Sequence, residues 1–341
     1  MLAISAMGFY MGKDFILRLA AIMSAALLVA ACGSPRETPQ TRSGADLKGE
    51  NLAQISAALG AEKIDIWNGK PVGNVASAAE KIRGKYALTN ISKPRMELFL
   101  IENAKRGNGF VIVCPGGGYS FLNGLHEGYG IARRLNQMGV SAAVLWYRAP
   151  DNRKGALQDL LRSIRIARAN AERWKINPEK IAVMGFSAGA DLAARASTRY
   201  LKKEYAPVDE IDSLSARPDN TILVYPAYCD EPMYRMRWVE SVMGDIPSVD
   251  YNTDYKLTPH LPVDKDTPPA LIIQTLDDKM CKNSSLAYFL ALKEAGVKAN
   301  LFMCDTGGHG YGLCSSRPDL LVSAWPAVLE KYLQINGYIK K

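Results

Sequence analysis

The stretch Lys180–Arg195, KIAVMGFSAGADLAAR, places a serine between two glycines directly after an apolar run. The run predicts a buried strand, and the alanine-rich residues that follow predict a helix. A side chain at Gly185 or Gly189 would clash with the neighbouring strand or helix, so the glycines favour a sharp turn. Ser187 would stand on that turn, which is the context of a serine nucleophile. Close packing of small residues is the alternative, so the rest of the chain must supply a base and an acid.

Strands and helices alternate on both sides of this stretch. Strands are predicted at 86–91, 96–101, 109–116, 140–148, 180–186, 220–227, 269–276 and 298–304. Helices are predicted at 129–139, 156–174, 188–197, 284–296 and 318–335. This alternation predicts an α/β fold with a mostly parallel sheet and helices on both faces. Between residues 227 and 268 the pattern breaks, and we expect a small cap-like excursion there.

The helix at 156–174 has an apolar stripe that should face the sheet. Asp159, Arg162, Arg165 and Arg173 lie off that stripe. The simplest interpretation is that the arginine face is solvated.

Three histidines are available as a base. His309, in DTGGHGYG, follows the last predicted strand, and its glycine neighbours leave room for the ring to reach Ser187. A purely structural role in the loop is the alternative. His260 lies in the excursion and precedes the candidate acid, so we expect it at the surface or in the cap. His126 could contact substrate or pack with Glu127.

The acid should follow the strand that precedes the histidine's strand. The segment IIQTLDDKMC offers Asp277 and Asp278 at that place. A buried carboxylate there would fix the tautomer of the imidazole and stabilise its charged form. We favour Asp278 and keep Asp277 as the second choice.

The segment VCPGGGYSF ends a predicted strand in three glycines. Such a loop exposes backbone N–H groups that can bind the oxyanion of a tetrahedral intermediate. Gly117 and Gly118 are the expected donors, together with Ala188 after the serine, and Tyr119 is a possible substrate contact. A tight turn without function is the alternative. A nucleotide site is not indicated, because neither G-x-G-x-x-G nor a Gly-Lys-Ser/Thr sequence is present.

Composition narrows the function further. The chain has 341 residues, 22% of them charged, and a formal net charge of +8 spread along its length. No dense basic run with interleaved aromatic residues indicates nucleic-acid binding, although acidic polysaccharides could be attracted. After Cys32, the remaining cysteines are odd in number and lack C-x-x-C spacing, so neither a disulfide framework nor a zinc site is expected. A bridge between Cys304 and Cys314 is conceivable, but free buried thiols are favoured.

The N-terminus predicts export. Residues 1–32 contain a short apolar run that ends in Val29-Ala30-Ala31-Cys32. This resembles a bacterial lipoprotein signal, in which Cys32 would be lipidated and anchor an outer-membrane or periplasmic protein; a plain secretory signal is the alternative. Residues 33–63 are expected to be a tether with a poorly assigned segment, and residues 64–341 the catalytic domain.

The motifs PGGGYSFL, HEG, GFSAGADLA, TPPALIIQTLDD and GGHGYGL resemble secreted bacterial α/β-hydrolases of the acetyl-xylan and feruloyl esterase type, often named xylanases or dienelactone-hydrolase-like. The resemblance covers roughly residues 64–336. It implies a cofactor-free and metal-free esterase that removes short acyl groups from plant polysaccharides or oligosaccharides. The chain departs from the family pattern after the acid, where Asp278 is followed by Lys279-Met280-Cys281. This difference borders the expected active site and bears on the identity of the substrate more than on the mechanism.

Three alternatives stay open. A small-molecule carboxylesterase or lipase and a peptidase-like hydrolase would use the same serine, acid and histidine. A lipase should carry an apolar lid, whereas the excursion is charged throughout, and a prolyl-oligopeptidase-type peptidase would need a propeller for which residues 33–85 are too few. A non-catalytic sugar-binding lipoprotein would be expected to have lost one of the three residues, and all three are present.

Overall fold

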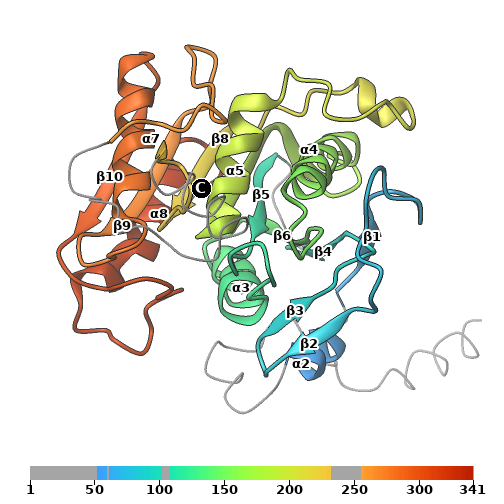
Figure 1. Cartoon of the computed structure of the whole chain (residues 1–341), viewed down its shortest axis with the longest axis horizontal. Coiled ribbons are helices and arrows are strands. Elements are labelled where there is room, and N and C mark those ends of the chain that lie inside the picture. Colours follow the sequence, from blue (N-terminus) through green and yellow to red (C-terminus); the bar gives the residue numbers. More distant parts are fainter. Residues whose placement is uncertain (1–51, 60, 102–106, 232–254, 341) are drawn as a thin grey trace, which may run out of the picture. The chain divides into compact units, whose positions relative to one another are not determined.

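The computed structural model describes residues 52–59, 61–101, 107–231 and 255–340. These residues form an eight-stranded sheet in the order β1-β4-β6-β5-β7-β8-β9-β10 (Figure 1). Its strands are β1 (Lys63–Asp65), β4 (Arg95–Phe99), β6 (Ser141–Trp146), β5 (Asn108–Cys114), β7 (Ile176–Phe186), β8 (Asn220–Val224), β9 (Ala270–Thr275) and β10 (Ala299–Cys304). Strands β6, β5, β7, β8, β9 and β10, neighbours in that order, pair in parallel. Strand β4 is antiparallel to both β6 and β1.

Helices flank this sheet. They are α3 (Gly130–Gln137), α4 (Arg153–Ala169), α5 (Ala188–Arg199), α7 (Lys282–Glu294) and α8 (Trp325–Ile335), with a π-helical turn η3 (Leu125–Tyr129) before α3 and short 3₁₀ turns η4 (Glu210–Ser213) and η5 (Leu321–Ala324). Helices α4 and α5 lie side by side and pack on β7. Gly139 follows the end of α3 with φ 87°, as expected of a residue that ends a helix. The predicted α/β fold class is confirmed.

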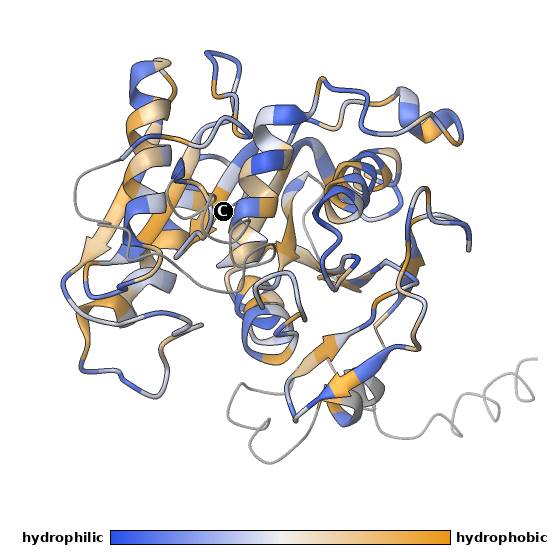
Figure 2. Ribbon diagram, viewed as in Figure 1, coloured by the Kyte–Doolittle hydropathy of each residue, from blue (hydrophilic) through white to orange (hydrophobic). Residues whose placement is uncertain are grey.

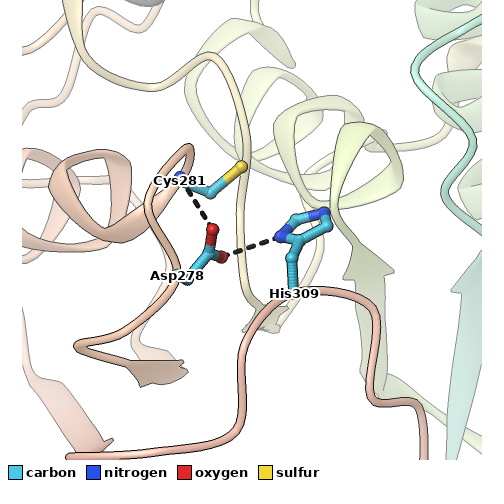
Figure 3. A group of neighbouring side chains, drawn as sticks. All are labelled: Asp278, Cys281 and His309. Atoms are coloured by element: carbon cyan, nitrogen blue, oxygen red, sulfur yellow. Dashed lines mark hydrogen bonds and ion pairs between the residues drawn. The ribbon is translucent and has the colours of Figure 1, made fainter.

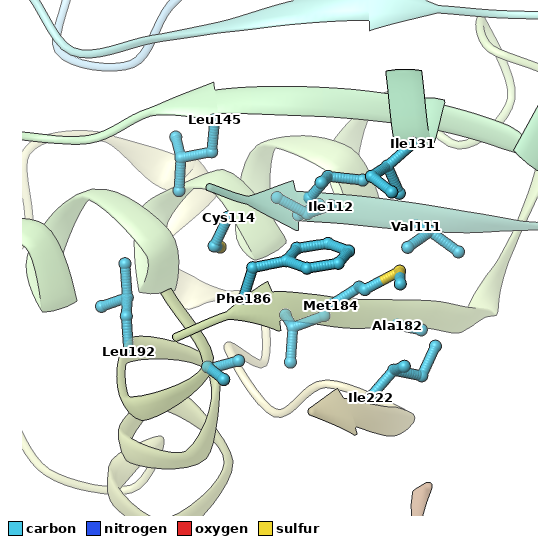
Figure 4. Close-up of a cluster of buried hydrophobic side chains, with 14 of the residues drawn as sticks. Val111, Ile112, Cys114, Ile131, Leu145, Ala182, Met184, Phe186, Leu192 and Ile222 are labelled. Carbon is cyan, nitrogen blue, oxygen red and sulfur yellow. The ribbon is translucent and has the colours of Figure 1, made fainter. Parts of the chain in front are cut away.

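The core lies between the central strands and these helices. Every residue of β5 and β6 is buried, which explains their uninterrupted apolar sequences. Figure 4 shows Met184 and Phe186 of β7 among Ile112 of β5, Ile131 of α3 and Ile222 of β8. Apolar residues accordingly follow the central strands, whereas the helices carry both kinds of residue (Figure 2). This packing fixes the carboxyl ends of the parallel strands at one edge.

The described fold includes residues before position 64, where the catalytic domain was expected to begin. Helix α2 (Leu52–Leu59) buries Leu52 and Ile55, and the N–H of Leu52 donates to the carbonyl of Lys85 at 2.8 Å. The predicted strand at 86–91 is the short β3 (Ala87–Thr89), which pairs with β2 (Lys81–Arg83) in a separate antiparallel hairpin. The short, exposed β2 gave no alternating pattern that could predict it.

The expectation that the arginines of this segment face solvent holds for Arg173, which lies exposed beyond the end of α4, but it is wrong for Arg162. Asp159 and Arg162 are fully buried. Asp159 accepts hydrogen bonds from Arg148 and, at 2.7 Å, from the indole N–H of Trp67. Arg162 donates to the carbonyl of Ile66 and pairs with Asp212 at 2.8 Å. Segments far away in the sequence therefore cover the face of α4 that the sheet leaves open, and these contacts cannot be seen in the periodicity of the helix.

Two expectations involve residues outside the described part of the chain. The lipoprotein signal with Cys32 lies wholly outside it, as do residues 232–254 of the excursion. The described ends of the excursion meet at an antiparallel bridge between Asp230 and Leu257. Among the described residues, no helix has the length and apolar character needed to cross a membrane.

Candidate active site

Ser187 lies on a tight turn between β7 and α5. Its backbone has φ 51° and ψ −118°, a conformation that is rarely adopted by residues other than glycine. A Cβ on Gly185 would come within 2.0 Å of the carbonyl oxygen of Gly189, and a Cβ on Gly189 within 2.1 Å of that of Cys114. The expectation that both flanking positions need glycine is confirmed. The turn holds the serine at the carboxyl edge of the sheet.

His309 joins Ser187 to an acid. Its Nε2 lies 2.9 Å from Ser187 Oγ, and its Nδ1 lies 2.7 Å from Asp278 Oδ2. Asp277 faces another way, since its exposed carboxylate accepts the N–H groups of Gly307 and Gly308 at 3.1 and 2.7 Å. The structure therefore brings together Ser187, His309 and the favoured acid.

Asp278 is anchored by the backbone that follows it. Its Oδ1 accepts the N–H groups of Met280 and Cys281 at 3.2 and 3.0 Å, which leaves Oδ2 for the imidazole (Figure 3). Only 2% of the residue is exposed. A buried carboxylate in this position favours the tautomer with the proton on Nδ1, so Nε2 is free to accept from the serine hydroxyl.

Cys281 brings a third potential ligand atom to this pair. In the described part of the chain, ligand atoms of Asp278, Cys281 and His309 lie within 4.8 Å of one another. Burial raises the pKa of the Cys281 thiol well above its ordinary value, so the thiolate that binds metals is disfavoured. An Nδ1 that donates its proton to a carboxylate has no lone pair for a metal either. The chemistry of this group fits a hydrogen-bonded pair better than a metal centre.

All five cysteines in the described part of the chain are buried and unpaired. The preference for free buried thiols over a bridge between Cys304 and Cys314 is therefore confirmed.

The glycine loop approaches the same point. Gly117 and Gly118 have φ 132° and 62°, and a Cβ on Gly117 would come within 2.0 Å of the carbonyl oxygen of Phe121. Within the described residues, no protein acceptor binds the N–H of Gly117 or Gly118. Ala188 begins α5, where the first N–H groups have no partner inside the helix. All three expected donors are thus available to a ligand.

Glu127 positions these parts relative to one another, and the sequence analysis did not assign it this role. One oxygen of its buried carboxylate accepts the N–H of Gly116 at 2.8 Å, and the other accepts the hydroxyl of Tyr225 at 2.8 Å. The Tyr225 hydroxyl also accepts the N–H of Gly312, and the Tyr225 ring lies 5.0 Å from that of His309. Burial raises the pKa of Glu127, and the two hydrogen bonds oppose that effect. The HEG motif, which contains Glu127, was the one feature of the sequence that pointed to this residue.

The Tyr119 side chain does not face the site, contrary to its expected position as a possible substrate contact. Its side chain is fully buried, and its hydroxyl donates to Asp191 at 2.6 Å. Asp191 belongs to α5, so this bond fastens the glycine loop to the helix that follows Ser187. The positive φ of Tyr119, 61°, turns its side chain inward, and the sequence does not reveal such a turn.

The other two histidines lie apart from the hydrogen-bonded group. His126 is exposed, and its ring lies 4.7 Å from that of Tyr86, so its packing partner is Tyr86 and not Glu127. His260 is half-buried in the described end of the excursion, in agreement with the expected position at the surface or cap.

A pocket of about 480 Å³ opens above Ser187. Its lining comprises Arg83, Gly117, Gly118, Ser120, Phe121, Asn123, Glu127, Ser187, Ala227, Tyr228, Met280, Cys281, His309 and Gly310. The serine, the histidine and two of the free N–H donors thus share one cavity. A carbonyl group bound there could meet nucleophile, base and oxyanion donors together.

Comparison with known families agrees with this geometry. Residues 96–289, more than half of the chain, match the BD-FAE family model. An acetylxylan esterase of Xylanibacter ruminicola is 33% identical over 235 residues, which cover 66% of this chain and 45% of that protein. Endo-1,4-beta-xylanase B of Butyrivibrio fibrisolvens is 29% identical over 63% of this chain and 34% of its own length. The chain spans less than half the length of these two relatives.

Solved structures show the same fold. An acetyl ester-xyloside bifunctional hydrolase of Caldicellulosiruptor lactoaceticus has a TM-score of 0.67 and 30% identity, covering 82% of this chain and 98% of that one. A thermophilic esterase of Thermogutta terrifontis has a TM-score of 0.62 at 19% identity, covering 82% and 94%. The latter likeness concerns the fold alone.

Proposed function

Since this chain belongs to the BD-FAE family of α/β-hydrolases, we propose that it is a serine esterase that removes short acyl groups from plant saccharides. The observation that carries the proposal is the position of His309 between Ser187 Oγ, at 2.9 Å, and Asp278 Oδ2, at 2.7 Å. These are the distances that proton transfer from a nucleophile to an oriented base requires.

In the first half of the proposed reaction, Ser187 Oγ attacks the ester carbonyl and its proton passes to His309 Nε2. Asp278 stabilises the resulting imidazolium without accepting its proton. The carbonyl oxygen becomes negative and is bound by N–H groups of Gly117, Gly118 and Ala188. His309 then protonates the sugar oxygen as the C–O bond breaks, which releases the alcohol and leaves the acyl group on Ser187.

In the second half, water takes the place of the alcohol. His309 accepts a proton from the water as its oxygen attacks the acyl carbon, and the same N–H groups bind the oxyanion. The proton returns to Ser187 Oγ as the acyl–oxygen bond breaks. The carboxylic acid leaves and the enzyme is restored, with no cofactor in either half.

Two relatives support the substrate class. The protein of X. ruminicola is an acetylxylan esterase, and the structure from C. lactoaceticus is an acetyl ester-xyloside hydrolase. For this chain we therefore propose acetylated xylan fragments as substrates, with feruloyl-type esters as the other acyl group to test.

Release of acetate from acetylated xylo-oligosaccharide tests the proposal. We expect turnover by the wild type and a loss of at least about 10³-fold in Ser187→Ala, with feruloylated xylan assayed in parallel. Ser213→Ala, an exposed serine of η4, is the matched control and should keep full activity. Equal release by the wild type and Ser187→Ala, or no ester hydrolysed at all, would refute the proposal.

For the N-terminus we propose lipidation of Cys32, supported by its signal-like sequence. Expressed in a bacterial host, the wild-type protein should partition into detergent, whereas Cys32→Ser should move to the aqueous phase. Identical partitioning of the two proteins would exclude the anchor.

A further inference from the structure

The β2–β3 hairpin forms one wall of the active-site pocket. Leu88 of β3 exchanges two backbone hydrogen bonds with Leu122, of 2.9 and 2.8 Å, which fixes the hairpin to the end of the glycine loop. Arg83 of β2 and Phe121 of the loop both line the pocket. The position of Arg83 is therefore set by the same segment that carries the oxyanion donors.

The Arg83 guanidinium lies over an aromatic ring that follows the three glycines. It is 4.7 Å from the centroid of the Phe121 ring. The same ring lies beside the glycine loop, since a Cβ on Gly117 would come within 2.9 Å of Phe121 Cδ2.

Arg83 has no acidic partner within the part of the chain that the structure describes. Nearby Arg95, by contrast, pairs with Glu80 at 2.9 Å and Glu97 at 3.4 Å. The carboxylate in the pocket, that of Glu127, already accepts two hydrogen bonds from other groups. Arg83 is exposed, and within the described residues no hydrogen bond involves its guanidinium. The N–H edge of a guanidinium matches the two oxygens of a carboxylate.

We propose that Arg83 forms a subsite for a carboxylate on the sugar portion of the ester, so that the enzyme prefers acylated oligosaccharides that carry a uronic acid. This rests on the proposed esterase function and defines its substrate further. The net charge of +8 favours the approach of such acidic saccharides.

Two acetylated xylo-oligosaccharides, one with a glucuronic acid branch and one without, test the subsite. We expect the wild type to prefer the acidic substrate and Arg83→Gln to lower the ratio of the two kcat/KM values about tenfold, mainly through the KM of the acidic substrate. Arg83→Lys should keep part of the preference. Lys81→Gln, on the same strand but outside the pocket lining, is the control and should leave the ratio unchanged.

A binding measurement separates this proposal from the proposed reaction. In the Ser187→Ala background, calorimetry with the two deacetylated oligosaccharides should show tighter binding of the acidic one, lost in Ser187→Ala/Arg83→Gln. This result needs no turnover, so it stands even if ester hydrolysis fails. Equal affinity for both oligosaccharides, or a ratio that Arg83→Gln and Lys81→Gln change alike, would overturn the subsite.

Discussion

At the scale of residues, Ser187 is held in a strained backbone conformation by the groups around it. Its N–H donates to the carbonyl of Val224 at 3.1 Å, and its own carbonyl accepts from the N–H groups of Ala190 and Ala227 at 3.0 and 3.2 Å. Strain of this kind persists only where the surroundings over-determine it, and it is typical of functional sites. The hydroxyl is thereby presented to His309 before any substrate binds.

The two adjacent aspartates should differ sharply in their effect on kcat. Asp278→Asn should lower it by roughly 10⁴-fold, because an amide cannot fix the imidazole tautomer as a carboxylate does. Asp277→Asn should cost about tenfold or less, since Asp277 binds the N–H groups of Gly307 and Gly308 and not the imidazole. Steady-state kinetics with p-nitrophenyl acetate measure both; a larger loss in Asp277→Asn would move the acid role to that residue.

The sequence could predict that Ser187, Asp278 and His309 come together because each follows a recognisable strand. It could not place Tyr119 or assign Glu127, because their roles depend on contacts with residues far along the chain: Asp191 for Tyr119 and Tyr225 for Glu127. Motif spacing identifies groups at the ends of strands, whereas side-chain direction in a loop depends on individual φ values.

At the scale of elements, helix α4 is fastened to the N-terminal segment by buried charges. Arg148 and Asp159 are 1% and 0% exposed as side chains, with 2.9 Å between their charged atoms. Their contacts with Trp67 connect that segment to the helix. The strands of the sheet were predictable because their apolar runs are continuous, but this buried pair was not, because a helical period alone does not reveal what covers the polar face.

Asp159→Asn should therefore lower the free energy of unfolding by about 3–5 kcal/mol, because it leaves the buried Arg148 without its counter-charge. Asp266→Asn is the matched control, since Asp266 pairs with Lys265 at the surface, where both side chains are more than half exposed. That control should cost at most about 1 kcal/mol. Urea unfolding measures both, and equal changes would show that the buried pair contributes no more than a surface pair.

At the scale of the whole molecule, the active-site pocket collects parts from distant stretches of the described chain. The hairpin, the glycine loop, the serine turn and the histidine loop contribute residues from 83 to 310 to one pocket, and Asp278 contacts that group through His309. The match to the BD-FAE family confirms the resemblance found in the sequence motifs.

This shared pocket predicts a preference for short acyl groups. The reacting carbonyl would lie in a pocket of about 480 Å³, beside the polar side chains of Asn123 and Glu127, while the sugar portion extends through its opening. A longer chain gains about 0.8 kcal/mol per CH₂ only where it finds apolar surface. Among p-nitrophenyl esters, kcat/KM should be highest for acetate and fall through butyrate to octanoate. A profile that rises through octanoate would instead indicate a lipase-like acyl tunnel.

The central claim is that Ser187 is a nucleophile activated by His309, and covalent labelling tests it most directly. A fluorophosphonate, from which the serine oxygen displaces fluoride, should modify the wild type with one equivalent of label, located on Ser187 by peptide mass spectrometry. Ser187→Ala should take no label, and His309→Ala should be labelled at least about 100-fold more slowly. Label on another residue, or equal labelling rates in the wild type and His309→Ala, would contradict the account.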